Sequence, residues 1–217
     1  MKLVQNREGS KAGLTDQLRE LIAQGSWAPG AALRQEELAS RFGVSRIPVR
    51  DALHALQAEG LVVIDPNRGT FVARLTQEQL EEIFDLRVLL ECDALLHACP
   101  LHSERSLRRL ERLQEELDFE TEPLEWVRLD REFHTALYAP SMRARTLSLI
   151  GSLRMLVERF YLLKMGPEMR RREWNDEHQG LIDAVRAGNI PLAQQRLKDH
   201  LRQTQAVALA RLNAVST

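Results

Sequence analysis

The chain has 217 residues, of which 44% are hydrophobic and 28% charged, and its formal net charge is −1. This composition allows one large domain or two small ones and excludes a basic protein that coats nucleic acid indiscriminately. No apolar run approaches the roughly 18 residues of a membrane span, and the N-terminus lacks a signal-peptide segment. The two cysteines, Cys92 and Cys99, form no disulfide framework and no CxxC metal motif, which suits a reducing compartment. We therefore expect a cytoplasmic protein that does not interact with membranes.

Charge is divided unevenly along the chain. Residues 1–74 carry 10 Lys and Arg against 8 Asp and Glu, whereas the remainder carries 20 against 23. Any contact with nucleic acid is thus expected in the N-terminal third, through individually placed arginines.

The first third of the chain predicts three helices and a β-hairpin. The helices are expected over about 10–24, over RQEELASRFG, and over about 45–60. Ser45 suits the N-cap of the third helix, and Pro48 is tolerated in its first turn. The apolar runs LVVI and TFVA flank the turn sequence DPNRG, which is typical of a hairpin. Because only Gly43 and Val44 separate the second and third helices, we predict a winged helix-turn-helix domain over residues 1–74.

The remainder of the chain predicts helices alone. TQEQ at 76–79 is a capping box that begins a long helical region. Helices are expected over about 77–98, 104–118, 123–138, 142–165, 168–187 and 191–212. Their apolar faces predict an all-α bundle of six helices over residues 75–217. The fold class is therefore mainly α, with a winged helix-turn-helix followed by a helical bundle.

Two arginines begin the third helix, where the helix dipole disfavours cations. A helix-turn-helix places Ser45, Arg46 and Arg50 against phosphates and base edges in the major groove, and an arginine fork matches guanine. Arg68 and Gly69 lie at the hairpin tip, where glycine lets the backbone approach a groove closely. Each arginine alone could be a solvated surface residue, but the combination favours binding to DNA.

These residues carry a family resemblance. PGAAL…ELASRFGVSRIPVRDALHALQAEGLV…RGTFV closely resembles the DNA-binding domain of GntR-type bacterial transcription regulators, over about residues 14–72. The resemblance implies that Arg46, Arg50 and Gly69 contact operator DNA. Many members carry an arginine where this chain has Glu36, and Arg34 is the candidate to replace its phosphate contact. The expected DNA-contacting residues are Arg34, Ser45, Arg46, Pro48, Arg50, Arg68 and Gly69.

Four polar residues interrupt the apolar stripes of three bundle helices: Asp130, His134, His178 and His200. A buried carboxylate without a partner is costly. Each histidine alone could be a hydrogen-bonded core residue, but four such residues from three helices favour a metal site. Three imidazoles and one carboxylate suit Zn, Ni, Mn or Fe(II), and leave one or two positions open for water or a ligand.

Arg87 interrupts the apolar stripe of the first bundle helix. Its guanidinium fork suits a carboxylate ligand, and the alternative is a weak surface ion pair with Glu91. Asn175, one turn before His178, and Arg154 on the fourth bundle helix are further candidates for contact with an effector.

The second domain also carries a resemblance. LDREFHTAL and EHQGLIDAVRAGNIPLAQQRLKDHL resemble the effector-binding domain of the FadR subfamily of GntR regulators (the FCD type), over about residues 76–209. Six helices resemble its VanR-like group. The resemblance implies a divalent metal at the positions of Asp130, His134, His178 and His200, a small carboxylate effector on that metal, and dimerisation through the bundle.

The expected function is a homodimeric, ligand-responsive repressor that reads a pseudo-palindromic double-stranded operator and is not an enzyme. In one alternative the metal itself is the signal, and in another it is only structural. A metal-dependent hydrolase or oxygenase fused to a DNA-binding arm is disfavoured, because no further acid or base lies beside the expected ligands.

Overall fold

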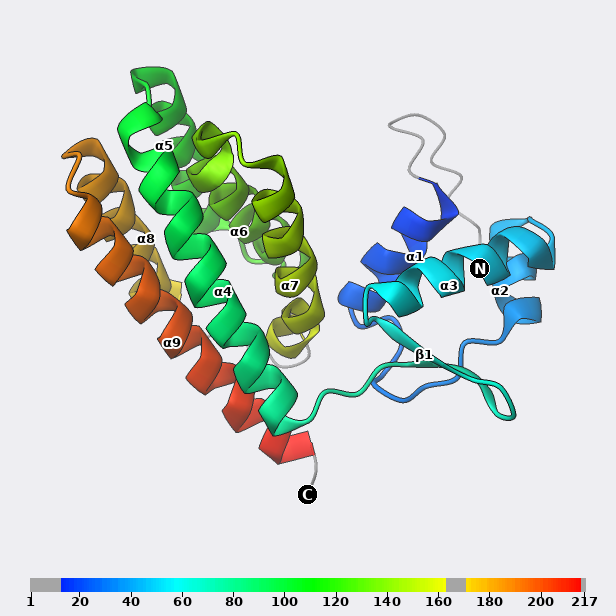
Figure 1. Cartoon of the computed structure of the whole chain (residues 1–217). Helices are drawn as coiled ribbons and strands as arrows, with labels where there is room; N and C mark the ends of the chain where they lie inside the picture. Colours follow the sequence, from blue (N-terminus) through cyan, green and yellow to red (C-terminus); the bar gives the residue numbers. More distant parts are fainter. Residues whose placement is uncertain (1–12, 163–170, 216–217) are drawn as a thin grey trace. The chain divides into compact units, whose positions relative to one another are not determined.

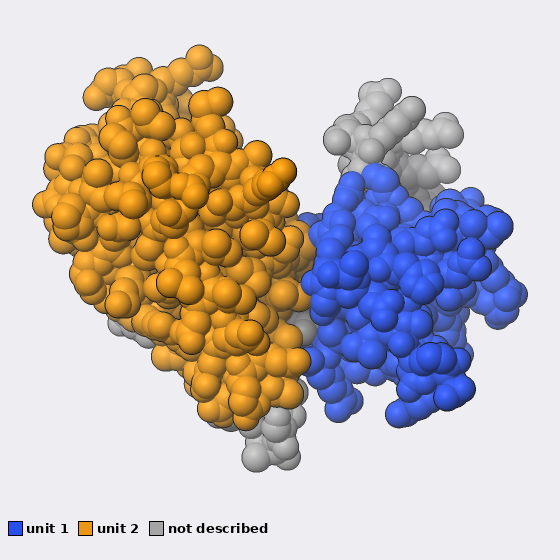
Figure 2. Space-filling view, viewed as in Figure 1, with its two compact units in different colours: residues 1–22, 26–74 blue, residues 23–25, 75–217 orange. Residues whose placement is uncertain are grey.

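The structure, a computed structural model, describes residues 13–162 and 171–215, with the backbone alone at 159–162, 171–173, 175 and 213–215. The chain divides into one unit of residues 1–22 and 26–74 and another of residues 23–25 and 75–217 (Figure 2). Within the described ranges, no helix is long and apolar enough to cross a membrane.

The first unit contains three helices and a hairpin, as predicted. Its elements are α1 (Leu14–Ala23), α2 (Gln35–Phe42), α3 (Arg46–Ala58), β1 (Val62–Asp65) and β2 (Gly69–Val72). The predicted start of the first helix at residue 10 lies outside the described residues. Gly43 ends α2 in the left-handed conformation, with φ 66°, which glycine adopts without a Cβ penalty. The chain can therefore turn within three residues and begin α3.

The hairpin and α3 each have one buried side. Val49, Leu53 and Leu56 of α3 are fully buried, so its opposite face is left to solvent. β1 and β2 are antiparallel, from Val62 opposite Val72 to Asp65 opposite Gly69. The Asp65 carboxylate accepts hydrogen bonds from the backbone N–H groups of residues 67 and 68 and closes the turn.

The second unit is a helical bundle (Figure 1). Its described α-helices are α4 (Gln77–Ala98), α5 (Glu104–Phe119), α6 (Pro123–Tyr138), α7 (Ala144–Leu162), α8 (Arg171–Arg186) and α9 (Ile190–Val215), with short 3-10 turns at Cys99–Leu101 and Ala139–Ser141. α4 and α9 run antiparallel side by side, and α5 packs against both α6 and α8. Leucine, tryptophan and phenylalanine side chains from these helices form the larger hydrophobic cluster. A second cluster contains Leu80, Ile83, Phe84, Val157 and Ala208. Within the described residues, the predicted bundle of six α-helices is confirmed.

Local signals set the helix starts. Thr76 and Gln79 form the predicted capping box: Thr76 Oγ1 accepts the Gln79 N–H at 3.3 Å, and Gln79 Oε1 accepts the Thr76 N–H at 3.0 Å. α7 begins at Ala144 rather than the predicted 142, because Met142 adopts the left-handed conformation with φ 53°. The predicted end of one helix at residue 165 and the predicted start of the next at residue 168 lie outside the described residues.

Candidate functional site

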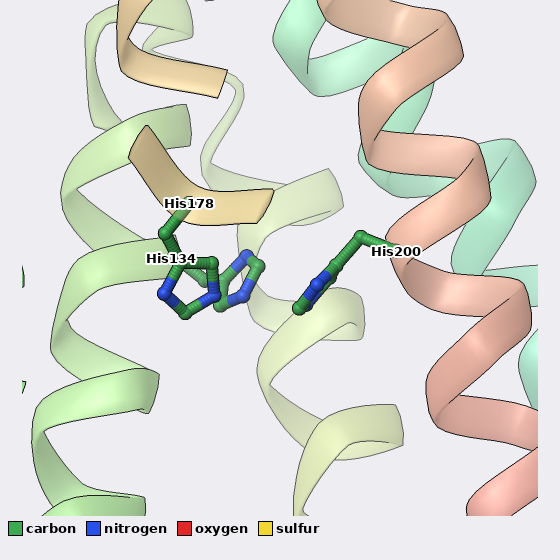
Figure 3. Close-up of side chains that lie close together, drawn as sticks. All are labelled: His134, His178 and His200. Carbon is green, nitrogen blue, oxygen red and sulfur yellow. The ribbon is translucent and has the colours of Figure 1, made fainter. Parts of the chain in front are cut away.

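Three histidines from three helices meet inside the bundle. His134 on α6, His178 on α8 and His200 on α9 point toward one another (Figure 3). One ligand nitrogen of each lies within 4.8 Å of the others, and the three side chains are 0%, 0% and 5% exposed. Three different helices thus bring the three predicted imidazoles together.

Asp130 lies beside this cluster, one turn before His134. Its Oδ1 is 3.6 Å from Nε2 of His134 and 3.6 Å from Nε2 of His178. Its Oδ2 accepts a hydrogen bond of 2.6 Å from Arg154. Ligand atoms on one metal with bonds of about 2.1 Å lie roughly 3–4 Å apart, so the spacing fits a shared ion.

The outer nitrogen of each histidine has an acceptor. The pairs are His134 Nδ1 with Tyr138 OH at 3.1 Å, His178 Nδ1 with Gln114 Oε1 at 3.0 Å, and His200 Nδ1 with Glu177 Oε2 at 2.7 Å. Such partners place the proton on Nδ1 and leave the Nε2 lone pair for a metal. Nε2 of His134 and of His178 is buried without a hydrogen-bond partner among the described residues. The donor set therefore fits a divalent ion.

Burial also sets the protonation of two of these histidines. Burial lowers the pKa of both imidazoles well below the ordinary 6.5, and the nearby Arg154 cation lowers the pKa further at His134 and at His178. Both rings are thus neutral at pH 7, which is the form that binds metal.

Arg87 and Glu91 form the ion pair considered from the sequence, but the pair is buried rather than on the surface. Arg87 Nε donates to Glu91 Oε1 at 2.7 Å, and the two side chains are 2% and 0% exposed. Glu91 Oε2 accepts from Tyr138 OH at 2.7 Å and from Arg154 at 3.3 Å. Burial alone raises the pKa of Glu91, but the two guanidinium groups outweigh it and lower the pKa, so the carboxylate is charged.

A cavity opens between these charged groups and the histidine cluster. It is partly open to solvent. It is lined by Arg87, Trp126, Asp130, Arg154, Trp174, His200 and Thr204. Arg87, the residue expected from the sequence to contact an acid, lies on the wall of this cavity. Asn175 belongs to α8, but its side chain lies outside the described residues.

The predicted DNA-contacting residues are all on exposed surface of the first unit. Ser45 is the N-cap residue of α3, although its side chain makes no capping hydrogen bond. Arg46 forms an ion pair with Glu36, and Arg50 lies 3.7 Å from Asp51. These exposed pairs are weak and can be exchanged for phosphate contacts.

The second group of predicted contacts flanks α3. Arg34 is the N-cap residue of α2, is 75% exposed and pairs with Glu37 at 3.1 Å. Gly69 has φ 99°, and an added Cβ would meet nothing within 4 Å. Arg68 lies over the Phe71 ring at 5.8 Å. Pro48 is exposed in the first turn of α3, next to Ile47, which is 63% exposed and was not singled out from the sequence.

Comparisons with known proteins match both units. Residues 11–72 match the family "Bacterial regulatory proteins, gntR family", and residues 82–203 match the FCD domain family. The chain is a GntR-family transcriptional regulator with an FCD domain. Proteins of this family are transcription regulators and not enzymes, in agreement with the expectation from the sequence.

Individual relatives of this GntR regulator agree. "Uncharacterized HTH-type transcriptional regulator YdhC" of Bacillus subtilis (strain 168) is 29% identical over 85% of this chain and 84% of its own. "HTH-type transcriptional repressor RspR" of Escherichia coli (strain K12) is 28% identical over 86% of this chain and 83% of its own. The solved structure of E. coli McbR/YncC is similar with a TM-score of 0.81 and 25% identity, and it covers 91% of this chain and 97% of that one.

Several residues of the site were not singled out from the sequence. Tyr138 follows His134 by four residues, and this helical spacing could have indicated the contact. Trp126 precedes Asp130 by the same spacing on α6. Gln114 and Glu177 reach the site through packing between helices, for which the sequence pattern has no signal.

Proposed function

We propose that this GntR regulator is a ligand-responsive repressor whose FCD domain binds a divalent metal and a small organic acid. The observation that carries the proposal is the buried group of three imidazoles, two of which have an Nε2 without a hydrogen-bond partner among the residues that the structure describes. Asp130, His134, His178 and His200 would hold the ion. When bound, the ion would supply a fixed positive charge and an open coordination position to the cavity.

The residues around the cavity support an acidic effector. Arg87 and Arg154 are buried, and each already has a carboxylate partner in Glu91 or Asp130. A guanidinium group can accommodate a ligand carboxylate through its planar fork. We infer that a bound acid changes the Arg87–Glu91 pair on α4, the helix that begins at the end of the first unit, and so weakens the hold on DNA.

The repressor activity, the homodimer and the cytoplasmic location are parts of the same proposal. Relatives named as repressors support the direction of regulation. Leu86, Leu89 and Leu96 form an exposed apolar stripe on α4, which is suited to a second copy of the chain. A homodimer would present two copies of α3 to a pseudo-palindromic operator in the cytoplasm, where bacterial DNA lies.

The first experiment is metal analysis of protein purified without added metal or a histidine tag. We expect close to one equivalent of Zn, Ni, Mn or Fe per chain in the parent, and little in Asp130→Ala or His178→Ala. Circular dichroism should show that both variants remain folded, and sedimentation velocity of the same samples reports the dimer. Full metal retention in His178→Ala would remove that residue from the site.

The same samples separate the alternatives. If the metal is the signal, operator affinity should follow free metal without any acid. If the metal is structural, its removal should lower the melting temperature of the bundle without changing any ligand affinity. Our proposal expects instead that an acid weakens operator binding only in the metal-loaded protein, and that operator DNA weakens acid binding by the same factor.

A further inference from the structure

The unsatisfied polar groups of the described chain gather at one place. Five buried side-chain atoms lack a hydrogen-bond partner among the described residues: Trp126 Nε1, His134 Nε2, Arg154 Nε, Trp174 Nε1 and His178 Nε2. The two imidazole atoms are accounted for by the proposed metal. The other three are N–H groups, and the metal cannot satisfy them because they have no lone pair to offer.

These three donors belong to residues that line the same cavity. Trp126 from α6 and Trp174 from α8 are 4% and 3% exposed, and their ring centroids are 5.1 Å apart. The two terminal nitrogens of Arg154 donate to Glu91 and Asp130. These bonds hold the guanidinium group in place, while its Nε has no hydrogen-bond partner among the described residues. The donors thus come from three different helices around one space.

Three unsatisfied donors indicate the polarity of the occupant. Buried N–H groups without an acceptor are rare in native proteins, and an acceptor supplied by a ligand removes the penalty of each. Indole and guanidinium groups donate and never accept. A ligand that fills the cavity should therefore present oxygen acceptors in addition to the carboxylate oxygens that face the metal and Arg87.

Charge limits the occupant further. The charged side chains in or against the cluster are two positive (Arg87, Arg154) and three negative (Glu91, Asp130, Glu177). With a divalent ion and neutral imidazoles, the cluster has one net positive charge. A monocarboxylate neutralises it, whereas a dicarboxylate would leave a negative charge in a buried site, which is costly.

We propose that the effector is a monocarboxylate that carries a second, uncharged oxygen acceptor, such as a ketone or an ether, and that the indole N–H groups of Trp126 and Trp174 select it. This inference rests on the proposed metal and organic-acid function and names the chemical class of the acid. The carboxylate lies toward the metal and Arg87, and the second oxygen accepts from the indoles.

The test uses metal-loaded, full-length protein and two matched series of acids. One series is 4-oxopentanoate, pentanoate and pentanedioate, and the other is 4-methoxybenzoate, 4-ethylbenzoate and benzene-1,4-dicarboxylate. Within at least one series, titration calorimetry should show the ketone or ether acid binding about tenfold tighter than its alkyl and dicarboxylate partners, since one hydrogen bond to an otherwise unsatisfied donor is worth roughly that factor.

Variants then assign the preference to the indoles. Trp126→Phe and Trp174→Phe keep an aromatic ring and remove the N–H, so the ratio of ketone-acid or ether-acid affinity to alkyl-acid affinity should fall toward one while the metal content stays the same. Trp27→Phe in the first unit is the matched control and should keep the preference. If a phenylalanine variant does not fold, 3-benzothienylalanine at the same position replaces the N–H by sulfur at nearly constant shape.

The outcomes separate this inference from the proposed function. Three results would overturn the inference and leave the metal and organic-acid function standing. They are metal-dependent binding with equal affinity for all members of both series, a preference for the dicarboxylates, and a preference that survives both tryptophan variants. Absence of metal-dependent binding of any of the six acids would overturn both.

Discussion

Arginines in the two units of the chain lie in opposite surroundings. Arg46 and Arg50 on α3 have side chains 67% and 58% exposed, whereas Arg87 and Arg154 beside the cavity are 2% and 8% exposed. The exposed pair has solvated, easily exchanged carboxylate partners, and the buried pair contacts the buried Glu91 and the partly buried Asp130. The first arrangement suits a partner that arrives from solvent with many charges, such as DNA. The second suits one small ligand in a prepared site.

The largest effect is expected from removing the Glu91 carboxylate, which pairs with both buried arginines. Glu91→Ala removes the buried carboxylate that pairs with Arg87 and with Arg154, so we expect the free energy of unfolding to fall by about 3–5 kcal/mol. Urea unfolding of the metal-free protein measures it. Glu104→Ala, which removes the exposed partner of Arg108, should leave the unfolding free energy nearly unchanged. A similarly small effect at Glu91 would mean that the buried arginines do not depend on that carboxylate.

The buried region should also be sensitive to pH. His134 and His178 have a lowered pKa in the folded chain, whereas an unfolded histidine titrates near 6.5. As pH falls below 6.5, the unfolded state takes up protons that the folded state does not, so stability is present above that pH and is lost below it. Each histidine contributes a slope of up to about 1.4 kcal/mol per pH unit.

Metal-free parent and His178→Gln measure this slope. Urea unfolding between pH 7.5 and 5.5 should show a steeper loss of stability in the parent, because the variant lacks one of the two groups. Equal slopes in the two proteins would show that His178 is protonated in the folded chain as readily as in the unfolded one.

Substitution of the exposed arginines should have the smallest effect, and that effect should appear in the affinity for DNA rather than in the stability of the protein. Arg46→Ala or Arg50→Ala should weaken operator binding by about 1–3 kcal/mol per lost base contact, with an unchanged melting temperature. If the lost contact is to phosphate instead, the slope of log affinity against log salt concentration should fall by about one, because one ion fewer is released on binding. Fluorescence anisotropy on an operator selected from random duplexes measures both, with Arg108→Ala as the exposed control. Unchanged affinity at physiological salt would remove the residue from the DNA-contacting set.

The sequence was informative wherever the relevant signal is local. The Gly43 break, the Thr76 capping box and the apolar stripes of α4, α6, α8 and α9 depend on neighbours within a few residues, and each was predicted. The stripe of α9 also showed His200 in place of an apolar residue. A buried histidine on a stripe can be recognised without knowing what faces it.

Other features depend on which helices face each other, and these could not be predicted. The Arg87–Glu91 pair has the spacing of a surface pair, and only the packing of α6 and α7 against α4 shows that it is buried. The unsatisfied indoles of Trp126 and Trp174 look like ordinary core residues in the sequence, because an acceptor from any neighbouring helix would have satisfied them.

Neither cysteine takes part in the proposed metal site. Burial raises the pKa of the Cys92 thiol, to about 11, and that of Cys99 as well, so both stay protonated at neutral pH, and a protonated thiol is a poor nucleophile and a poor metal ligand. The donors at the centre are imidazoles and a carboxylate, which do not undergo the oxidation steps of a thiolate. With a redox-inert ion such as Zn in the proposed site, the regulator would report the proposed acid independently of the thiol–disulfide balance of the cell, so oxidative stress and effector supply would remain separate signals.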